Sequence, residues 1–227
     1  MNSIASSIAE FFNSYAGLIG AGIIDTCLMV FLSTFIAYLF GIALGVILYI
    51  TDEHSLCPQR IWHGLLAWIV NISRSIPFII LLVAVMPVTR GLVGTTTGVV
   101  GVIPPLVLSA TPFIARMIEQ SLNEIDRLCI EAAQACGASL GRIIFSVLLP
   151  ESLPSIVRGV SISLITVLGY AAIVGAVGAG GLGDIAIRYG YYRYEDQVMF
   201  ATIILMVIIV QIIQTTCDFI AVRIDRR

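Results

Sequence analysis

Residues 197–217 read QVMFATIILMVIIVQIIQTTC and contain no charged side chain. A helix needs about 20 mostly apolar residues to cross a hydrocarbon core of about 30 Å. The strands of a membrane β-barrel are about 10 residues long and alternate polar with apolar side chains. Residues 203–210 do not alternate, because every one of them is apolar. We therefore predict that 197–217 is a transmembrane helix.

Four further stretches are long enough to span a membrane: 26–51, 61–89, 91–115 and 159–183, of which 61–89 is interrupted only by Arg74. Over its 227 residues the chain is 59% hydrophobic and 11% charged. A soluble domain carries about 25% charged residues, because its surface faces water. This composition excludes an ordinary soluble protein. It predicts an all-α integral membrane protein with about five transmembrane helices.

The positions of the arginines, which are all 12 of the basic residues, predict the orientation. Basic residues accumulate in the cytoplasmic loops of membrane proteins. With the N-terminus outside, the inner segments hold Arg60, Arg116, Arg127, Arg142, Arg158, Arg223, Arg226 and Arg227. The outer segments then hold Arg90, Arg188 and Arg193. This imbalance favours an N-out/C-in topology.

The N-terminal segment 1–22 has apolar residues at roughly helical spacing. It is either an interfacial amphipathic helix on the outer face or an extension of the first span. No basic residue precedes Arg60, which disfavours a cleaved signal peptide. We expect this extracytoplasmic segment to be followed by a membrane domain at 23–223 and a cytoplasmic tail at 224–227.

Arg74 and Pro77 mark an unusual place in the second span. A charge in the membrane costs several kcal/mol, on the order of 3, unless it faces protein or water. Pro77 cannot donate a backbone hydrogen bond, so the carbonyl of Ser73 loses its usual helical partner. One interpretation is that both residues line a translocation pathway. The other is that Arg74 lies near the inner interface and extends its charge into water.

No catalytic or metal-binding pattern is present. Residues 178–183, GAGGLG, fit the dinucleotide pattern GxGxxG but follow an apolar span instead of a strand. They are better explained as a turn in which backbones approach closely or change direction. The five cysteines form no Cys/His cluster, and no metalloprotease, serine-hydrolase or P-loop motif occurs. We expect no catalytic residue, bound metal or cofactor, and no nucleic-acid partner.

The polar stretch from about 116 to 152 is predicted to form two short amphipathic helices on the inner side. Gly137 follows a run of helix-forming residues and can adopt a positive φ, which predicts a turn. A single apolar face recurs afterwards at Ile143, Ile144, Val147 and Leu148. We expect Pro150 to stop this second helix and Pro154 to open the fourth span.

This stretch resembles the EAA motif of ABC-importer permeases, with Val147 standing where isoleucine is usual. The matching residues are Glu131, Ala132, Ala133, Gly137, Leu149 and Pro150. The resemblance implies that the loop at about 119–152 carries a coupling helix that inserts into a separate ATP-binding subunit. It implies that Glu131 and Arg142 make polar contacts, that Gly137 forms the turn and that Ile143 to Leu148 form a packing face. The alternative is an amphipathic loop that merely covers the inner end of the bundle.

Three further stretches resemble the methionine-importer permeases: 74–83, 111–117 and 175–183. The similarity covers the chain from Thr26 to Arg223 and is weak over 1–22. It implies a homodimer in the cytoplasmic (inner) membrane of a bacterium, with two ATP-binding subunits that hold ATP and Mg²⁺. It also implies an extracytoplasmic substrate-binding lipoprotein that delivers methionine in both enantiomeric forms. The chain itself is then a multi-pass transporter subunit and not an enzyme.

Two further sites are expected on the basis of this resemblance. The outer loop 184–196, which is rich in tyrosine, is either a docking face for the binding protein or an aromatic belt at the interface. Ile173 and Val174 are candidates for a hydrophobic gate. Two alternative functions remain open. One is a related permease for another amino acid, a phosphonate or a sulfonate, and the other is an ATP-independent channel or secondary transporter.

Overall fold

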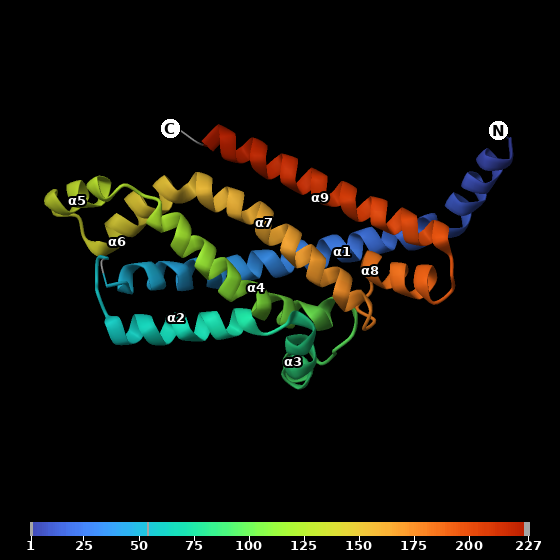
Figure 1. The fold of residues 1–227 in the computed structure, drawn as a ribbon, viewed down its shortest axis with the longest axis horizontal. Coiled ribbons are helices and arrows are strands. Elements are labelled where there is room, and N and C mark those ends of the chain that lie inside the picture. The colour runs from blue at the N-terminus through green and yellow to red at the C-terminus, as the bar shows by residue number, and fades with distance from the viewer. Residues whose placement is uncertain (1, 54, 225–227) are drawn as a thin grey trace. The chain divides into compact units, whose positions relative to one another are not determined.

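In a computed structural model of the chain, the structure describes residues 2–53 and 55–224, with side chains from Tyr15 onward. No strand occurs in these residues, which confirms the all-α prediction. The elements in chain order (Figure 1) are α1 (Asn2–Thr51), α2 (Arg60–Ser75), α3 (Phe78–Val93), α4 (Gly98–Asn123), α5 (Arg127–Ala135), α6 (Leu140–Ile143), the π-helical turn η1 (Ile144–Leu148), α7 (Leu149–Gly175), α8 (Gly181–Ile185), the π-helical turn η2 (Ala186–Tyr191) and α9 (Asp196–Ile224). The tail residues 225–227 lie outside the described residues.

Four described helical stretches are long and apolar enough to cross a membrane: Tyr15–Thr51, Gly98–Asn123, Leu140–Gly175 and Asp196–Ile224. A fifth is present if α2 and α3 together make one bent span. About five spans is therefore confirmed, but the second span is not one continuous helix. The break falls at Ile76, whose backbone is extended (φ −79°, ψ 123°). Pro77 explains this, because a proline disfavours helical backbone in the residue before it.

The third span is displaced from its predicted position, since it begins at Gly98 and ends at Asn123 instead of covering 91–115. Gly94 and Gly98 both adopt a positive φ, which separates α3 from α4. At the other end Arg116 and Glu119 form an ion pair within the helix at 2.6 Å. The charges that were expected to end the span therefore neutralise one another inside it.

The chain divides into two compact units, each of which is described by itself. Unit 1 consists of Met1–Ser33, Ile79–Leu106 and Thr166–Gln211. Its interior is apolar, and the fully buried side chains include those of Met29, Val30, Val102, Leu106 and Leu182. The parts of α1, α4 and α7 in this unit are therefore packed around a shared core, together with α8.

Unit 2 consists of Thr34–Phe78, Val107–Ile165 and Ile212–Arg227. Here α1 crosses α4 at two glycines four residues apart, Gly41 and Gly45. A Cβ atom at Gly45 would lie 2.6 Å from the carbonyl oxygen of Ala115. Such small-residue spacing lets two membrane helices approach until their backbones touch. Leu48, Val70 and Ala115 extend this contact into a core shared by α1, α2 and α4.

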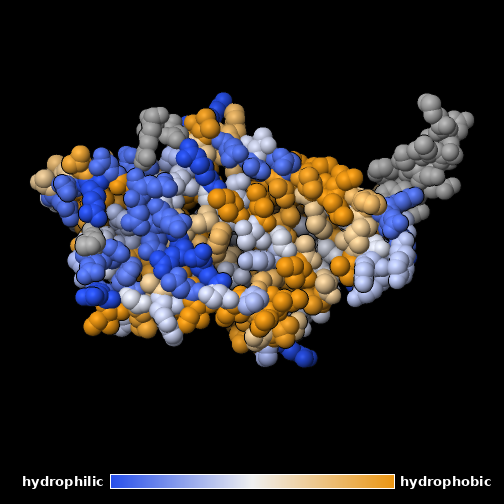
Figure 2. All heavy atoms as spheres, viewed as in Figure 1, coloured by the Kyte–Doolittle hydropathy of each residue, from blue (hydrophilic) through white to orange (hydrophobic). Residues whose placement is uncertain are grey.

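Large apolar side chains also cover much of the outer surface. On α9, Phe200, Ile204 and Ile212 are each exposed by more than half. Figure 2 shows hydrophobic residues over α3 and α9, and hydrophilic residues gathered over α5 and α6. An apolar surface of this kind is expected where a protein meets lipid or another chain, whereas the polar end is expected in water.

Candidate functional site

The loop between α4 and α7 folds as the two short helices predicted for it, with a turn between them. α5 begins after Asp126, whose carboxylate accepts a hydrogen bond from the backbone N–H of Leu128 at 3.0 Å. This is a side-chain N-cap, which satisfies one of the first N–H groups of the helix.

Gly137 ends α5 in a left-handed conformation with φ +74°. The Ala138 N–H donates to the Ala133 carbonyl at 3.1 Å, and the Gly137 N–H donates to the Gln134 carbonyl at 2.9 Å. These two bonds form a Schellman cap, in which a glycine closes the helix. The spacing of Ala133 and Gly137 in the motif is therefore the spacing of this cap, and the predicted turn is confirmed.

The remaining motif residues divide into an exposed set and an inward set. Glu131, Ala132, Arg142 and Pro150 are exposed, Ala133, Val147 and Leu149 are half-buried, and Ile143 is buried. The two charged side chains proposed for polar contact thus project into the surroundings, whereas Ile143 and the neighbouring Leu148 anchor α6 and η1 to the rest of unit 2.

Three apolar side chains of this loop point outward and were not singled out by the sequence pattern for that role. Leu128 is 68% exposed, Leu140 37% and Phe145 73%. We call these three residues the apolar surface of the loop. Exposed aromatic and aliphatic groups beside charged ones are typical of protein interfaces. Phe145 lies outside the apolar face that the periodicity predicts at Ile143, Ile144, Val147 and Leu148.

Pro150 and Pro154 do not interrupt the helix, so both predictions about these prolines were wrong. The helical stretch runs from Leu140 to Gly175 through both residues. Just ahead of them lies the π-helical turn η1, where the Leu149 N–H donates to the carbonyl of Ile144. A π turn widens the helix and shifts its hydrogen bonds by one residue, so a proline that cannot donate is accommodated directly after it.

A cavity of about 200 Å³ lies beside α5 in unit 2. Its lining comes partly from the end of α1 and the following connection, and partly from α5: Tyr49, Asp52, Ser55, Arg127, Glu131 and Gln134. The α1–α2 connection and the α4–α7 loop therefore lie together. This agrees with the predicted topology, which assigns both to the same side of the membrane.

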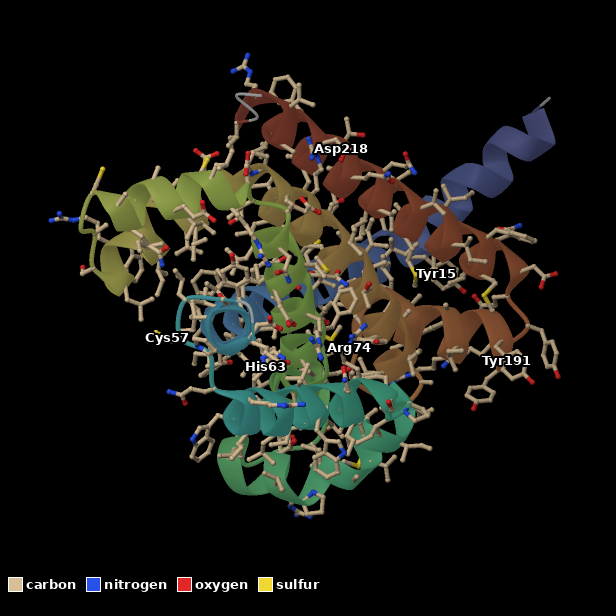
Figure 3. All side chains as sticks on the ribbon, turned by 60° about the vertical axis from the view of Figure 1, so that its left-hand side comes forward. Tyr15, Cys57, His63, Arg74, Tyr191 and Asp218 are labelled. Carbon is tan, nitrogen blue, oxygen red and sulfur yellow. The ribbon has the colours of Figure 1, made fainter. Side chains whose placement is uncertain are left out.

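The α1–α2 connection is held by His63, whose partners the sequence did not reveal. Its Nδ1 lies 3.1 Å from the Leu48 carbonyl oxygen, and its Nε2 lies 3.6 Å from an Asp52 carboxylate oxygen. The ring therefore contacts the free carbonyl end of α1 from the first turn of α2 (Figure 3). This contact fixes the connection that borders the cavity.

Arg74 lies in the last turn of α2 and is exposed, and Pro77 follows at the break before α3 (Figure 3). One turn earlier on α2, the Asn71 Oδ1 accepts a hydrogen bond from Arg116 of α4 at 3.2 Å. Arg116 also pairs with Glu119, which is 7% exposed. A polar network thus links α2 to α4 within unit 2, close in sequence to the residues proposed for the pathway.

Ile173 and Val174 lie in the last turn of α7, in unit 1. Val174 is fully buried, whereas Ile173 is 41% exposed. The glycine-rich segment follows directly and forms the predicted turn, with positive φ at Gly178, Gly180 and Gly181. A Cβ atom at Gly175 would meet the backbone of Gly183 and Asp184, so α7 and α8 touch through their main chains.

The loop 184–196 carries the predicted aromatic cluster. Tyr191, Tyr192 and Tyr194 are each more than 60% exposed, while Arg193 stacks over the Tyr189 ring at 4.5 Å. From α1, the Tyr15 ring meets Tyr189 edge to face. Among the described residues, no group of three or more His, Cys, Asp or Glu side chains is placed to hold a metal ion.

The described helices, with four or five candidate membrane spans, define a multi-pass membrane protein. Residues 41–227 match the family described as "Binding-protein-dependent transport system inner membrane component", and the chain belongs to this family. It is therefore a multi-pass inner-membrane component of a bacterial transport system and a transporter subunit, not an enzyme.

Particular relatives are similar over nearly the whole chain. A probable D-methionine transport system permease protein MetI of Vibrio cholerae serotype O1 is 42% identical over 222 residues, covering 98% of this chain and 99% of that protein. The methionine import system permease protein MetP of Bacillus subtilis is 41% identical, covering 80% and 82%. The inward-facing MetNI methionine ABC transporter matches with a TM-score of 0.93 at 45% identity, covering 94% of this chain and 99% of that one. The Vibrio match extends into segment 1–22, where the motifs showed little resemblance.

Proposed function

We propose that this chain forms the translocation pathway for methionine, in both D and L forms, in an ATP-driven importer of the bacterial cytoplasmic membrane. The observation that carries this proposal is the end-to-end match to the MetNI methionine ABC transporter at a TM-score of 0.93. Relatives named for methionine transport at about 40% identity support the same substrate.

The proposed assembly contains two copies of this chain. Each chain has one EAA-type loop, and an importer driven by two ATP-binding subunits needs two such loops. ATP and Mg²⁺ are held by those subunits and not by this chain. An extracytoplasmic binding lipoprotein delivers the substrate, and the tyrosine-rich loop 184–196 is its proposed docking face, with an aromatic belt at the bilayer interface as the alternative.

In the proposed coupling step, α5 and α6 fit a groove on the ATP-binding subunit. The apolar surface of the loop, Leu128, Leu140 and Phe145, supplies the buried contact, because exposed apolar groups release water on docking. Glu131 and Arg142 supply charged contacts at its edge. Closure of the ATP-binding subunits then moves α6, and the continuous helix from Leu140 to Gly175 carries that movement into the membrane.

We place this loop on the cytoplasmic side, which corresponds to the N-out/C-in topology. The arginine distribution supports the orientation. Within the membrane, Arg74 and Pro77 at the α2–α3 break are the proposed lining of the pathway. Ile173 and Val174 at the end of α7 are the proposed gate, in which Val174 packs inward and Ile173 presents the exposed surface.

The test is uptake of radiolabelled methionine into proteoliposomes that contain this chain, its ATP-binding subunit and its binding protein. We expect uptake that requires ATP, and competition by unlabelled D- and L-methionine. Competition by another amino acid, a phosphonate or a sulfonate in place of methionine would reassign the substrate. Uptake without the ATP-binding subunit would identify a channel or secondary transporter instead.

The coupling assignment is tested separately with Glu131→Ala and Gly137→Val. Both variants should assemble with the ATP-binding subunit and hydrolyse ATP, but import less methionine for each ATP consumed. A matched control is Gln134→Ala, which lies on the same helix outside the motif matches. Wild-type uptake in both coupling variants would contradict the assignment.

A further inference from the structure

Helix α8 lacks a side-chain cap of its own. It begins at Gly181, and its N-cap position is occupied by Gly180, which has φ +84° and no side chain to offer. The first N–H groups of any helix have no partner within that helix. Here the Leu182 N–H donates to the hydroxyl oxygen of Thr26 on α1 at 2.8 Å. Thr26 thus supplies, from 156 residues away in sequence, the cap that the glycine cannot supply.

The Thr26 hydroxyl both accepts and donates a hydrogen bond. It accepts from Leu182 and donates to the carbonyl of Gly22 at 2.8 Å, and the residue is only 4% exposed. A Cβ atom at Gly181 would lie 2.7 Å from the same hydroxyl oxygen and 2.8 Å from the terminal methyl group of Met29. The absence of a side chain at Gly181 is therefore what lets α1 reach the α8 backbone.

The opposite side of α8 touches the end of α7. A Cβ atom at Gly183 would meet the backbone of Ala172, just as one at Gly175 would meet Gly183 and Asp184. The Ala179 N–H donates to the carbonyl of Val174 at 3.3 Å. Consequently α8 is fixed to α1 by one hydrogen bond and by close packing at Gly22, and to the last turn of α7 by main-chain packing.

We propose that Thr26 is a positioning residue for translocation, because it joins α1 to the segment that holds Ile173 and Val174. This inference rests on the proposed function, in which these two residues form the gate. The joint is a single hydrogen bond beside extensive packing. Loss of the hydrogen bond should leave the fold in place, while α8 and the end of α7 follow the movement of α1 less closely. ATP is then hydrolysed in cycles in which the gate fails to pass substrate, so less methionine is imported for each ATP.

The experiment uses the complete importer, reconstituted with its ATP-binding subunit and binding protein, and measures methionine imported per ATP hydrolysed. Thr26→Val keeps the shape of the side chain and removes the hydroxyl. We expect the ratio to fall by about fivefold or more, the effect of leaving a buried N–H unpaired, with ATP hydrolysis maintained. Thr26→Ser, which retains the hydroxyl, should restore most of the ratio.

The matched control is Thr202→Val in the same unit. Thr202 is fully buried like Thr26, but its hydroxyl donates to carbonyls of its own helix, those of Val198 and Met199. We expect this variant to retain the wild-type ratio. An equal fall in the Thr202 variant would mean that any buried threonine has this effect, and it would overturn the assignment.

If Thr26→Val does not assemble, Thr26→Ser is compared with Thr26→Ala, because these two differ only in the hydroxyl. Equal ratios of methionine to ATP in that pair would also overturn the proposal. The proposed function fails differently, since the wild-type importer would then transport no methionine. A wild-type importer that transports methionine, with unchanged coupling in the Thr26 variants, refutes the role of Thr26 alone.

Discussion

The turn at Gly137 and the turn at 175–183 both depend on glycine, but only the second is tightly packed. Gly137 has φ +74°, and no described atom lies within 4 Å of the position its Cβ would occupy. Gly175 and Gly183 show no positive φ, yet a Cβ on either would collide with backbone atoms. The first turn requires only a backbone conformation, whereas the second requires space as well, because Gly178, Gly180 and Gly181 also have positive φ.

This difference corresponds to what each turn contacts. The Gly137 turn lies between two exposed helices and leaves its surroundings open, as a surface that binds a partner must. The 175–183 turn packs against α1 and α7 of its own unit and leaves no room for a side chain at Gly175, Gly181 or Gly183. One region is open, as its proposed contact with the ATP-binding subunit requires, and the other holds helices of the same unit closely together.

The largest effect is expected from Gly175→Ala. The added methyl group meets the backbone of Gly183 and Asp184, which cannot rotate away as a side chain does. Overpacking of this kind costs typically 1–3 kcal/mol, and we expect about 3 kcal/mol here because the obstacle is main chain. The measurement is the thermal unfolding midpoint of the purified chain in detergent.

The control for this substitution is Gly169→Ala on the same helix. No described atom lies within 4 Å of a Cβ at Gly169. Alanine is favoured over glycine inside a helix by about 0.5–1 kcal/mol, so the midpoint should stay or rise. Equal midpoints for the two variants would show that the 175–183 turn is no tighter than the rest of α7.

A smaller loss is expected from Gly137→Ala. Nothing described obstructs the methyl group, but a non-glycine residue in the left-handed region costs about 1–2 kcal/mol. The unfolding midpoint should fall less than for Gly175→Ala. Gly141→Ala serves as the control, because Gly141 has equally open surroundings and no positive φ, so it should have little effect. A fall at Gly141 as large as at Gly137 would remove the distinction between conformation and space.

Much of the fold could be predicted because bilayer and solvent impose simple local rules. Uncharged stretches such as 197–217 predicted the helices, and the pattern from Glu131 to Gly137 predicted α5 and its turn. The predictions failed where neighbouring elements decide the outcome. A π turn ahead of Pro150 lets the helix continue, and the pair of Arg116 with Glu119 lets α4 extend beyond its uncharged run.

In the candidate site, too, local features could be predicted and features that depend on neighbouring elements could not. Motif spacing predicted the two helices and the turn of the loop, but not the outward direction of Phe145, because a register shift of one residue at η1 changes the face that a side chain in this turn occupies. The contact between Thr26 and Leu182 was out of reach for a different reason. It joins residues 156 positions apart, and no periodicity within either segment reports it.

Asp126→Ala should lower the stability of α5 alone by about 1 kcal/mol, because it removes the cap on the Leu128 N–H. Hydrogen exchange at the α5 amides should quicken, while the amides of α4 remain protected. Asp126→Asn keeps the acceptor oxygen and should restore the protection. If the exchange rates of the α5 amides are unchanged in the alanine variant, packing of Ile130 and Ile143, and not the cap, stabilises α5.

The smallest effect on stability is expected from Phe145→Ala, because the side chain is 73% exposed in the chain and such changes stay within about 0.5 kcal/mol. The same substitution should nevertheless weaken binding of the ATP-binding subunit by about 30-fold, since aromatic anchors at interfaces are worth about 2 kcal/mol. Phe200→Ala is the control: its ring is 64% exposed on α9, outside the loop sequence, and should not alter this binding. Titration of the ATP-binding subunit onto each variant in nanodiscs measures the difference. Equal affinities for both variants would contradict the proposal that the apolar surface of the loop binds a partner. The exposed Phe145 ring would then contribute neither to the fold nor to docking.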